Sequence, residues 1–407
     1  MASLDYLPAC DFPAVVDSDD EQVEFSDAAS YLTDDGDGLT WSVRSAATSV
    51  IGPRPKQEDR HSRIDSGLGS GPHPGLPRPL IAFYGVFDGH GGVRAAKIAS
   101  QHVWRHVHAD LTAALGGGEI PSERALHNIM HHAFASTEEE ILHQAANGGW
   151  RDGSTAVCVL ICGATLVVAN LGDSRAVLGT RSKRKLDVVR LSEDHKPEVP
   201  AEARRIHAAG GRVTLEGGVA RLNGDLSLSR AFGDAEYKPK PAPRCAGTLD
   251  TPSTSGVLRA PSTGHAGTSM AGTTAPAGKG RAKQTKPAKP VPAKPVRPPS
   301  ALSALPDVTN RELRPSDTFV LLGCDGLWDV LSDREACEIV DTVLRDTGAD
   351  VQAACDQLVQ FVVQSADCTD NVTAVLVLLE RVAREPEDDA TELDSSAVYD
   401  RNYPALG

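Results

Sequence analysis

The chain has few of the features that mark membrane, secreted or disulfide-stabilised proteins. None of its apolar runs approaches the roughly 20 residues that a membrane helix needs, which excludes an integral membrane protein. The first eleven residues lack the basic start and the apolar stretch of a secretory signal. The eight cysteines follow no zinc or disulfide spacing, and we interpret Cys158 and Cys162 as packing residues on one face of a strand. We therefore expect a cytoplasmic protein, a nuclear protein, or one found in both compartments.

Charge is distributed unevenly along the 407 residues. Residues 1–39 contain eleven Asp or Glu and no Lys or Arg, which predicts an acidic disordered arm over residues 1–40. Residues 238–300 are rich in Pro, Ala and Gly and carry eleven Lys or Arg against the single acid Asp250. We interpret 240–304 as a disordered basic insert within a folded domain of residues 41–381, followed by an acidic tail over 382–407. The overall net charge of −14 argues against a nucleic-acid-binding protein.

Hydrophobic periodicity predicts helices and strands in blocks. An apolar stripe at three- and four-residue spacing predicts a helix over residues 126–142, the second of two after residue 92. Residues 154–162, 165–170 and 175–179 are predicted to form an antiparallel meander, and 201–209 a short helix ending at Gly210. A strand over 318–323, helices around 336–343 and 351–362, and a last strand over 372–379 follow. This order favours an α+β fold with antiparallel sheets over a doubly wound fold.

Isolated acids stand where apolar strands end. Asp88, Asp173 and Asp325 follow strand-like runs or the glycine turn after one, and Asp370 opens the last strand. Each Asp-Gly taken alone is typical of a simple turn. Carboxylates at strand ends can nevertheless converge in space, and an oxygen-rich cluster without His or Cys ligands indicates Mg²⁺ or Mn²⁺ rather than Zn²⁺.

Eight ordered segments resemble the motifs of the type 2C (PPM) serine/threonine phosphatases, most of all those of plants and the green lineage. They span the region from about Trp41 to Glu380, interrupted by the basic insert. The segments are residues 54–59 (RPKQED), 87–92 (FDGHGG), 152–156 (DGSTA), 170–176 (NLGDSRA), 194–197 (DHKP), 229–234 (SRAFGD), 324–329 (CDGLWD) and 370–373 (DNVT).

The resemblance implies a β-sandwich of two antiparallel sheets with helices on both sides and a two-metal site at one end. It implies that Asp88 bridges both metals, with Glu58 and the Gly89 carbonyl on one and Asp325 and Asp370 on the other. The other roles that it implies are support from Asp59 and Asn371, a third metal at Asp173 and Asp329, phosphate binding by Arg54 and general-acid catalysis by His90. From the residues alone, Asp173 fits a hairpin turn as well as a third-metal ligand.

These roles suit hydrolysis of phosphoserine and phosphothreonine esters in proteins. A water or hydroxide bridging two Mg²⁺ or Mn²⁺ ions would attack phosphorus, and a third ion is an option in the family. Arg54 can hold the phosphate in bidentate fashion, and His90 can protonate the departing alkoxide. His195 and Lys196 are interpreted as loop-stabilising residues.

Two other functions compete with this one. A catalytically silent pseudophosphatase would bind phosphoproteins without turnover, although such proteins usually lack metal ligands that this chain retains. A metal-dependent nuclease uses similar carboxylates but does not fit the motif order or the charge. We expect a monomer whose partners are phosphoproteins, with no membrane or nucleic-acid partner. The basic insert is either an unselective linker or an attractant for acidic segments such as residues 1–39.

Overall fold

The computed structural model describes residues 24–25, 39–65, 80–116, 120–183, 185–238 and 300–383. Most of the predicted acidic arm, the insert and the acidic tail lie outside the described residues. Two boundaries differ from the prediction. The described residues resume at Ser300 rather than after residue 304, and Leu302 is fully buried with Ile206, Leu222 and Leu228. The last strand continues to Ala383. Inside the predicted arm, Glu24–Phe25 form a short strand.

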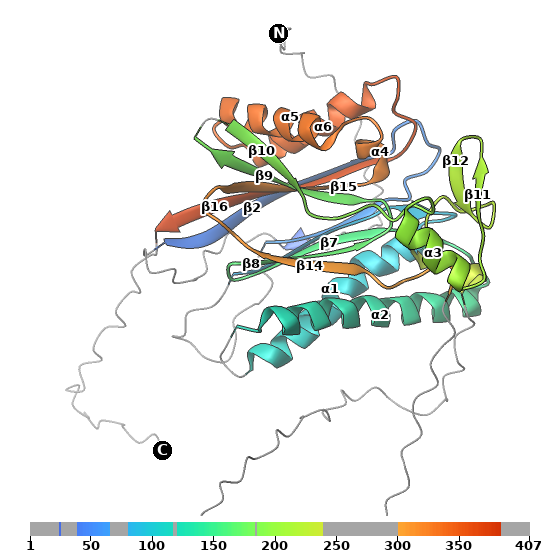
Figure 1. The fold of residues 1–407 in the computed structure, drawn as a ribbon. Coiled ribbons are helices and arrows are strands. Elements are labelled where there is room, and N and C mark those ends of the chain that lie inside the picture. Colours follow the sequence, from blue (N-terminus) through green and yellow to red (C-terminus); the bar gives the residue numbers. More distant parts are fainter. Residues whose placement is uncertain are drawn as a thin grey trace, which may run out of the picture. The chain divides into compact units, whose positions relative to one another are not determined.

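Two sheets lie face to face in the folded unit (Figure 1). In the first sheet, every pair of neighbouring strands is antiparallel except the pair at one edge, which is parallel. The second sheet is antiparallel throughout. The first sheet has the order β1 (Glu24–Phe25), β3 (Arg60–Ile64), β4 (Ile81–Phe87), β7 (Ala156–Cys162), β8 (Thr165–Leu171), β14 (Asp307–Glu312). The second has the order β10 (Lys185–Arg190), β9 (Arg175–Ser182), β15 (Asp317–Gly323), β16 (Val372–Ala383), β2 (Leu39–Val50).

Helices cover the outer face of each sheet (Figure 1). α1 (Arg94–Leu115) and α2 (Glu123–Gly148) lie against the first sheet, and α5 (Asp333–Asp346) and α6 (Val351–Val363) lie against the second. Shorter elements complete the described residues: α3 (Pro200–Ala208), α4 (Asp325–Trp328), η1 (Ala235–Tyr237), a hairpin of β11 (Val213–Glu216) and β12 (Val219–Leu222), and a small sheet of β5 (Gly89–His90), β6 (Gly153–Ser154) and β13 (Phe232–Gly233). No helix among these is long and apolar enough to cross a membrane.

The alternation of side chains along β4 explains the layering. Phe83 and Phe87 point toward α1 and α2, whereas Tyr84 and Val86 point into the space between the sheets. The strand is buried on both faces, which is why its sequence is an unbroken apolar run. The core therefore has three layers of apolar packing, one between the sheets and one under each helix pair.

Most predicted elements are confirmed, and one connection was wrong. The predicted stripe of the second helix is buried along α2, and Cys158 and Cys162 pack under the helices as expected. The predicted meander continues only from β7 to β8. The next strand, β9, belongs to the other sheet, so the turn at Gly172 and Asp173 carries the chain across the sandwich.

Candidate functional site

Asp88 is fixed by backbone contacts at the end of β4. Its N–H donates to Thr155 Oγ1 at 3.2 Å, and its carbonyl accepts from the Thr155 N–H at 2.9 Å. Thr155 in turn shares a hydrogen bond of 2.7 Å with the Ser174 hydroxyl, which stands at the turn between the sheets. The ends of β4, β7 and β8 are thereby tied together around the Asp88 carboxylate.

Three aspartates from distant parts of the sequence converge there. Carboxylate oxygens of Asp88, Asp173 and Asp325 lie within 4.8 Å of one another. Asp88 follows β4, Asp173 lies in the turn before β9, and Asp325 begins α4 directly after β15. All three stand at strand ends on one edge of the sandwich, as the pattern of isolated acids predicted.

The electrostatics of this cluster favour a bound cation. Burial raises the pKa of Asp325 to about 7, with the charges of Asp173 and Asp329 adding to the effect. Burial, followed by the charge of Asp325, raises the pKa of Asp88 well above its usual range. Carboxyl groups that resist ionisation in this way are relieved by a divalent ion, and an all-oxygen donor set suits a hard cation. These residues therefore fit a metal site.

Lys196 also reaches this cluster. Its ammonium group forms an ion pair with the Asp173 carboxylate. Burial alone would lower the pKa of Lys196, but Asp173, Asp325 and Asp329 raise it. The sequence interpretation of Lys196 as a loop residue missed this contact, because a Lys-Pro pair in a loop gives no local signal of a carboxylate beside it.

Asp329, the second residue suggested for a third metal, is exposed and caps the C-terminal end of α4. Its pKa is raised by partial burial, an effect that Lys196 opposes and Asp173 reinforces. The structure thus brings Asp173 into the central cluster and leaves Asp329 at its rim.

Asn371 holds the segment around Glu58 against the start of β16. Its side-chain oxygen accepts from the Glu58 N–H at 2.9 Å, and its Nδ2 donates to the carbonyls of Ile51 at 2.8 Å and Lys56 at 2.9 Å. A Cβ on Gly89 would lie 2.4 Å from the Glu58 carbonyl oxygen, so the two chains touch where the sequence has glycine. Glu58, Gly89 and Asn371 are therefore neighbours.

Arg54 and Asp370 lie beside these hydrogen bonds of Asn371. The Arg54 guanidinium donates to the Thr369 carbonyl at 3.0 Å and pairs with the Asp370 carboxylate. The Arg54 side chain is exposed, as a phosphate-binding group at the mouth of a site would be. Asp370 adds its charge to those that raise the pKa of Asp325 and is therefore close to the central cluster.

Asp59 lies behind the cluster in the core. Its carboxylate accepts from the Thr373 hydroxyl at 2.7 Å, and that hydroxyl also shares a 2.8 Å hydrogen bond with Ser49. Burial raises the pKa of Asp59 to about 6, although the hydrogen bond from Thr373 opposes this shift. Asp59 also contacts Asp88, since a hydrogen bond with Asp88 is among the effects that lower its pKa, and its supporting role stays a prediction.

His90 is paired with a carboxylate that no predicted role included. His90 Nε2 lies 2.8 Å from Asp234 Oδ2, and Asp234 is 4% exposed. Burial alone would lower the pKa of His90, but the hydrogen bond to Asp234 and the Asp234 charge raise it. The signal in the sequence was the SRAFGD segment, whose last residue is Asp234.

The small sheet of β5, β6 and β13 brings His90 and Asp234 together. His90 pairs with Gly153, and Gly233 pairs with Gly153 from the other side. A Cβ on Gly153 would lie 2.2 Å from both His90 Nε2 and Asp234 Oδ2. Gly153 is thus needed because any side chain would displace the imidazole–carboxylate pair.

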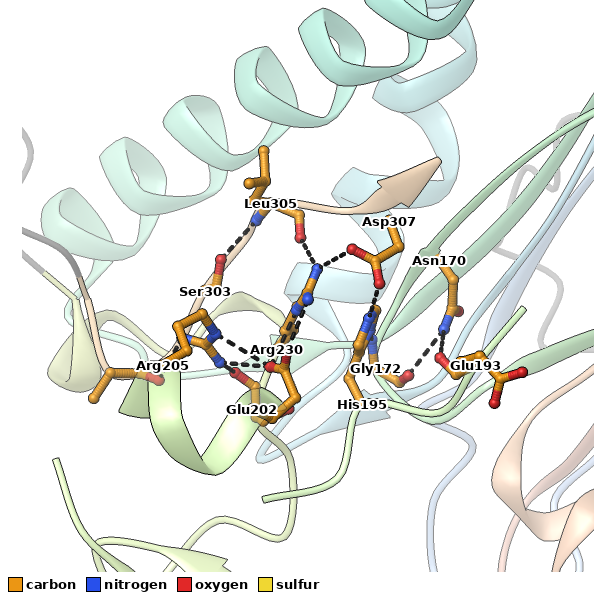
Figure 2. A network of polar contacts seen from close by, with 12 residues as sticks. Asn170, Gly172, Glu193, His195, Glu202, Arg205, Arg230, Ser303, Leu305 and Asp307 are labelled. Carbon is orange, nitrogen blue, oxygen red and sulfur yellow. Dashed lines mark hydrogen bonds and ion pairs between the residues drawn. The ribbon is translucent and has the colours of Figure 1, made fainter. Parts of the chain in front are cut away.

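His195 is structural, as the sequence predicted. Its Nδ1 accepts from the Gly172 N–H at 3.1 Å, and its Nε2 lies 3.1 Å from Asp307 Oδ2 (Figure 2). Asn170 Nδ2 donates to the carbonyls of Gly172 and Glu193 in the same network. These contacts hold the turn that carries Asp173.

A sandwich with a carboxylate cluster at its edge fits a metal-dependent enzyme, and comparison with known proteins specifies the family. Residues 46–372 match the family model described as protein phosphatase 2C. The chain is 30% identical to rice "Probable protein phosphatase 2C 67" over 83% of its length and 75% of that protein. It is also 30% identical to the human "Integrin-linked kinase-associated serine/threonine phosphatase 2C" over 80% of its length and 70% of that protein.

The fold has the same relatives. The crystal structure of a serine-threonine phosphatase 2C from Toxoplasma gondii superposes with a TM-score of 0.56 at 22% identity, covering 87% of this chain and 98% of that one. The chain belongs to the protein phosphatase 2C family, whose members are metal-dependent protein serine/threonine phosphatases.

Proposed function

We propose that the chain hydrolyses phosphoserine and phosphothreonine esters with two Mg²⁺ or Mn²⁺ ions held at the edge of the sandwich. The observation that carries this proposal is the convergence of Asp88, Asp173 and Asp325, whose oxygens lie within 4.8 Å. Glu58, the Gly89 carbonyl and Asp370 would complete the ligand set. Asn371 brings these segments together, because it accepts a hydrogen bond from the Glu58 N–H and donates one to the Asp370 carboxylate. Asp173 and Asp329 are the candidates for a third ion.

The metal ions would supply an acidified water and positive charge against the phosphoryl oxygens. The residues of the chain have separate tasks. Asp59 would support Asp88, because the Asp59 carboxylate is held by the 2.7 Å hydrogen bond from Thr373 and is itself in hydrogen-bonding contact with Asp88. Lys196 compensates the charge of Asp173 from the opposite side.

Arg54 and His90 would act on the substrate itself. Arg54 is exposed beside Asp370 and can turn its guanidinium toward a phosphate that approaches the cluster. His90 would donate a proton to the departing serine or threonine oxygen. Asp234 raises the pKa of His90, which increases the share of the imidazolium form that could donate this proton.

The test is metal-dependent turnover by the purified full chain. A phosphothreonine peptide should be hydrolysed with Mn²⁺ or Mg²⁺ present, and hydrolysis should stop when EDTA is added and return with excess metal. Asp88→Asn and Asp325→Asn should reduce kcat by at least about 10³-fold, since loss of the ions removes the main electrostatic contribution to catalysis. Asp110→Asn, an acid on α1 far from the cluster in sequence and fold, is the matched control and should keep full activity.

Two outcomes contradict the proposal. Turnover that persists in excess EDTA would exclude a metal-dependent reaction. Tight binding of the phosphopeptide without turnover at any metal concentration would instead establish the pseudophosphatase.

A further inference from the structure

Two histidines and a glutamate meet between α1 and α2. His102 and His106 are one helical turn apart on α1, so their side chains share one face, and Glu140 lies on α2 opposite them. One ligand atom from each of the three lies within 4.8 Å of the others. This cluster is separate from the aspartates at the sandwich edge, and none of its residues belongs to the eight family-like segments.

One nitrogen of the cluster, His106 Nε2, makes no hydrogen bond within the described residues. His102 Nδ1 lies 2.9 Å from Glu140 Oε2, and the other Glu140 oxygen accepts from Gln144 Nε2 at 3.3 Å. His106 Nε2 is shielded from solvent and has no hydrogen-bond partner among the described residues. A buried ring nitrogen without a partner is costly, and a bound ion would satisfy it.

The donor set selects a different cation from that of the phosphatase site. Two imidazole nitrogens and one carboxylate oxygen suit Zn²⁺, which takes four ligands at about 2.0–2.2 Å and accepts water as the fourth. Tetrahedral ligands at that distance are about 3.3 Å apart, close to the separation already present between His102 and Glu140. Gln144 would orient the glutamate, as hydrogen-bond partners of metal ligands commonly do.

We propose that His102, His106 and Glu140 form a Zn²⁺ site that links α1 to α2, with the fourth position open to water. The site takes borderline divalent cations and discriminates against Mg²⁺, whose preferred ligands are oxygens. Bound zinc joins the two helices that cover the first sheet and stabilises the folded chain by mass action.

The experiment measures zinc uptake by the full chain, purified without a histidine tag and saturated with Mg²⁺. ZnCl₂ is titrated against a chromophoric chelator, and the Tm is followed with and without zinc. The double variant His102→Gln/His106→Gln is compared with His127→Gln/His131→Gln. His127 and His131 have the same four-residue spacing on α2 and ring centroids 4.5 Å apart, but among the described residues they belong to no group of three ligand atoms within 4.8 Å of one another.

We expect the His102→Gln/His106→Gln variant to lose one bound equivalent of zinc and the rise in Tm that zinc causes. The His127→Gln/His131→Gln variant should keep both. Glu140→Gln, which preserves size and can still bond His102, should weaken zinc binding at least about tenfold. Phosphatase activity in Mg²⁺ and the far-UV spectrum should be unchanged in all three, which shows that each variant folds.

CoCl₂ gives an independent reading, because Co²⁺ in a four-coordinate nitrogen and oxygen site absorbs visible light strongly. The absorption should appear with the native chain and be absent from His102→Gln/His106→Gln. Equal zinc uptake by the native chain and that variant, uptake lost in His127→Gln/His131→Gln instead, or no uptake by the native chain would each overturn the proposal.

Discussion

Asp234 raises the pKa of His90 and so favours its protonated form, although the two residues are far apart in the sequence. The 2.8 Å contact between His90 Nε2 and Asp234 Oδ2 stabilises the protonated ring, which burial alone would disfavour. A general acid is useful only while it carries its proton. If His90 is the proposed general acid, the Asp234 carboxylate therefore extends the pH range in which it would act.

Asp234→Asn should move the alkaline limb of the kcat profile to lower pH. Asparagine keeps the hydrogen-bonding atoms near His90 but removes the charge that raises its pKa, so the ring loses its proton at lower pH. At pH 8 we expect about a tenfold or larger loss of kcat on a phosphothreonine peptide. The loss should be much smaller on p-nitrophenyl phosphate, whose leaving group needs little protonation.

The control for this prediction is the double variant. In a His90→Asn background, Asp234→Asn should change kcat no further, since its effect is transmitted through the imidazole. An unchanged pH profile in Asp234→Asn, or equal losses on both substrates, would show that His90 is not the acid.

Asp325 illustrates the opposing demands of catalysis and stability. Its pKa is raised to about 7 by burial and then by Asp173 and Asp329, so the folded chain without metal binds more protons than the unfolded chain. Stability from this source is complete below the unfolded value of 3.8 and is lost as the pH rises through about 7. Bound divalent ions would reverse the penalty by neutralising the carboxylates.

Asp325→Asn should consequently raise the Tm of the EDTA-treated protein at pH 8 while abolishing turnover. Each kcal/mol of relieved repulsion corresponds to roughly 2–4 °C for a domain of this size. The gain should shrink at pH 5, where Asp325 is already protonated in the native chain. Asp333→Asn is the control: Asp333 accepts from Arg175 at 2.7 Å and Arg190 at 2.8 Å, so its loss should lower the Tm. A lower Tm for Asp325→Asn in EDTA at pH 8 would contradict the argument.

At the scale of elements, the long amphipathic segments could be predicted and the crossings could not. The α2 stripe from Leu126 to Leu142 is buried as predicted, because a 3.6-residue period has one structural explanation. A two-residue period describes β9 equally well in either sheet, so the sequence could not show that the chain changes sheets at Asp173. The two-residue strand β1 is too short to carry any period.

The candidate site divides in the same way. Asp88 and Asp325 could be identified because an acid directly after a buried strand is unusual, and the structure places both in one cluster. The contact of Asp234 with His90 and the ion pair of Lys196 with Asp173 could not be identified from the sequence, since both depend on loops that meet only in the folded chain. The roles given to Glu58, Asp370 and Arg54 stay predictions until tested.

α3 is fastened to the chain on both sides of the basic segment by Glu202. Its carboxylate accepts from Arg205 at 2.8 Å and from Arg230 at 2.7 Å (Figure 2). Arg230 also donates to the Leu305 carbonyl at 2.9 Å and to the carboxylate of Asp307, the first residue of β14, at 2.7 Å. Burial alone would raise the pKa of Glu202, but Arg230 and Arg205 lower it to about 2.

Arg230→Met should lower the free energy of unfolding by about 2–4 kcal/mol at pH 7, because it leaves a buried carboxylate with one partner fewer. The depressed pKa of Glu202 contributes stability above its ordinary value of 4.5, and this contribution is lost as the pH falls toward 2. The cost of the substitution should therefore decrease in acid. Urea unfolding at both pH values measures it, with the exposed Arg212→Met as control. Equal effects of the two substitutions would show that the network contributes little.

At the scale of the whole molecule, the two ends of residues 239–299 are already held together by the folded unit. The Ser300 hydroxyl donates to the Tyr237 carbonyl at 2.8 Å. Arg205 donates to the carbonyls of Ser300 at 3.2 Å and Ala301 at 2.9 Å. The flanks therefore need no long connection to reach each other, and α3 anchors the chain where it returns.

Replacing residues 239–299 with a six-residue Gly-Ser linker should keep the fold and the metal-dependent hydrolysis of p-nitrophenyl phosphate. A connection about ten times shorter lowers the entropy cost of loop closure by about 2 kcal/mol, so the Tm should rise slightly or stay equal.

The removed residues carry most of a net charge of +10, and we propose that they attract acidic partners. The shortened chain should accordingly show a higher KM for a phosphopeptide flanked by glutamates at low salt. The difference should disappear at about 0.5 M salt and be absent for a neutral phosphopeptide. Equal KM values for both chains at low salt would leave the segment as a linker alone, whereas loss of p-nitrophenyl phosphate hydrolysis would mean that it supports the site directly.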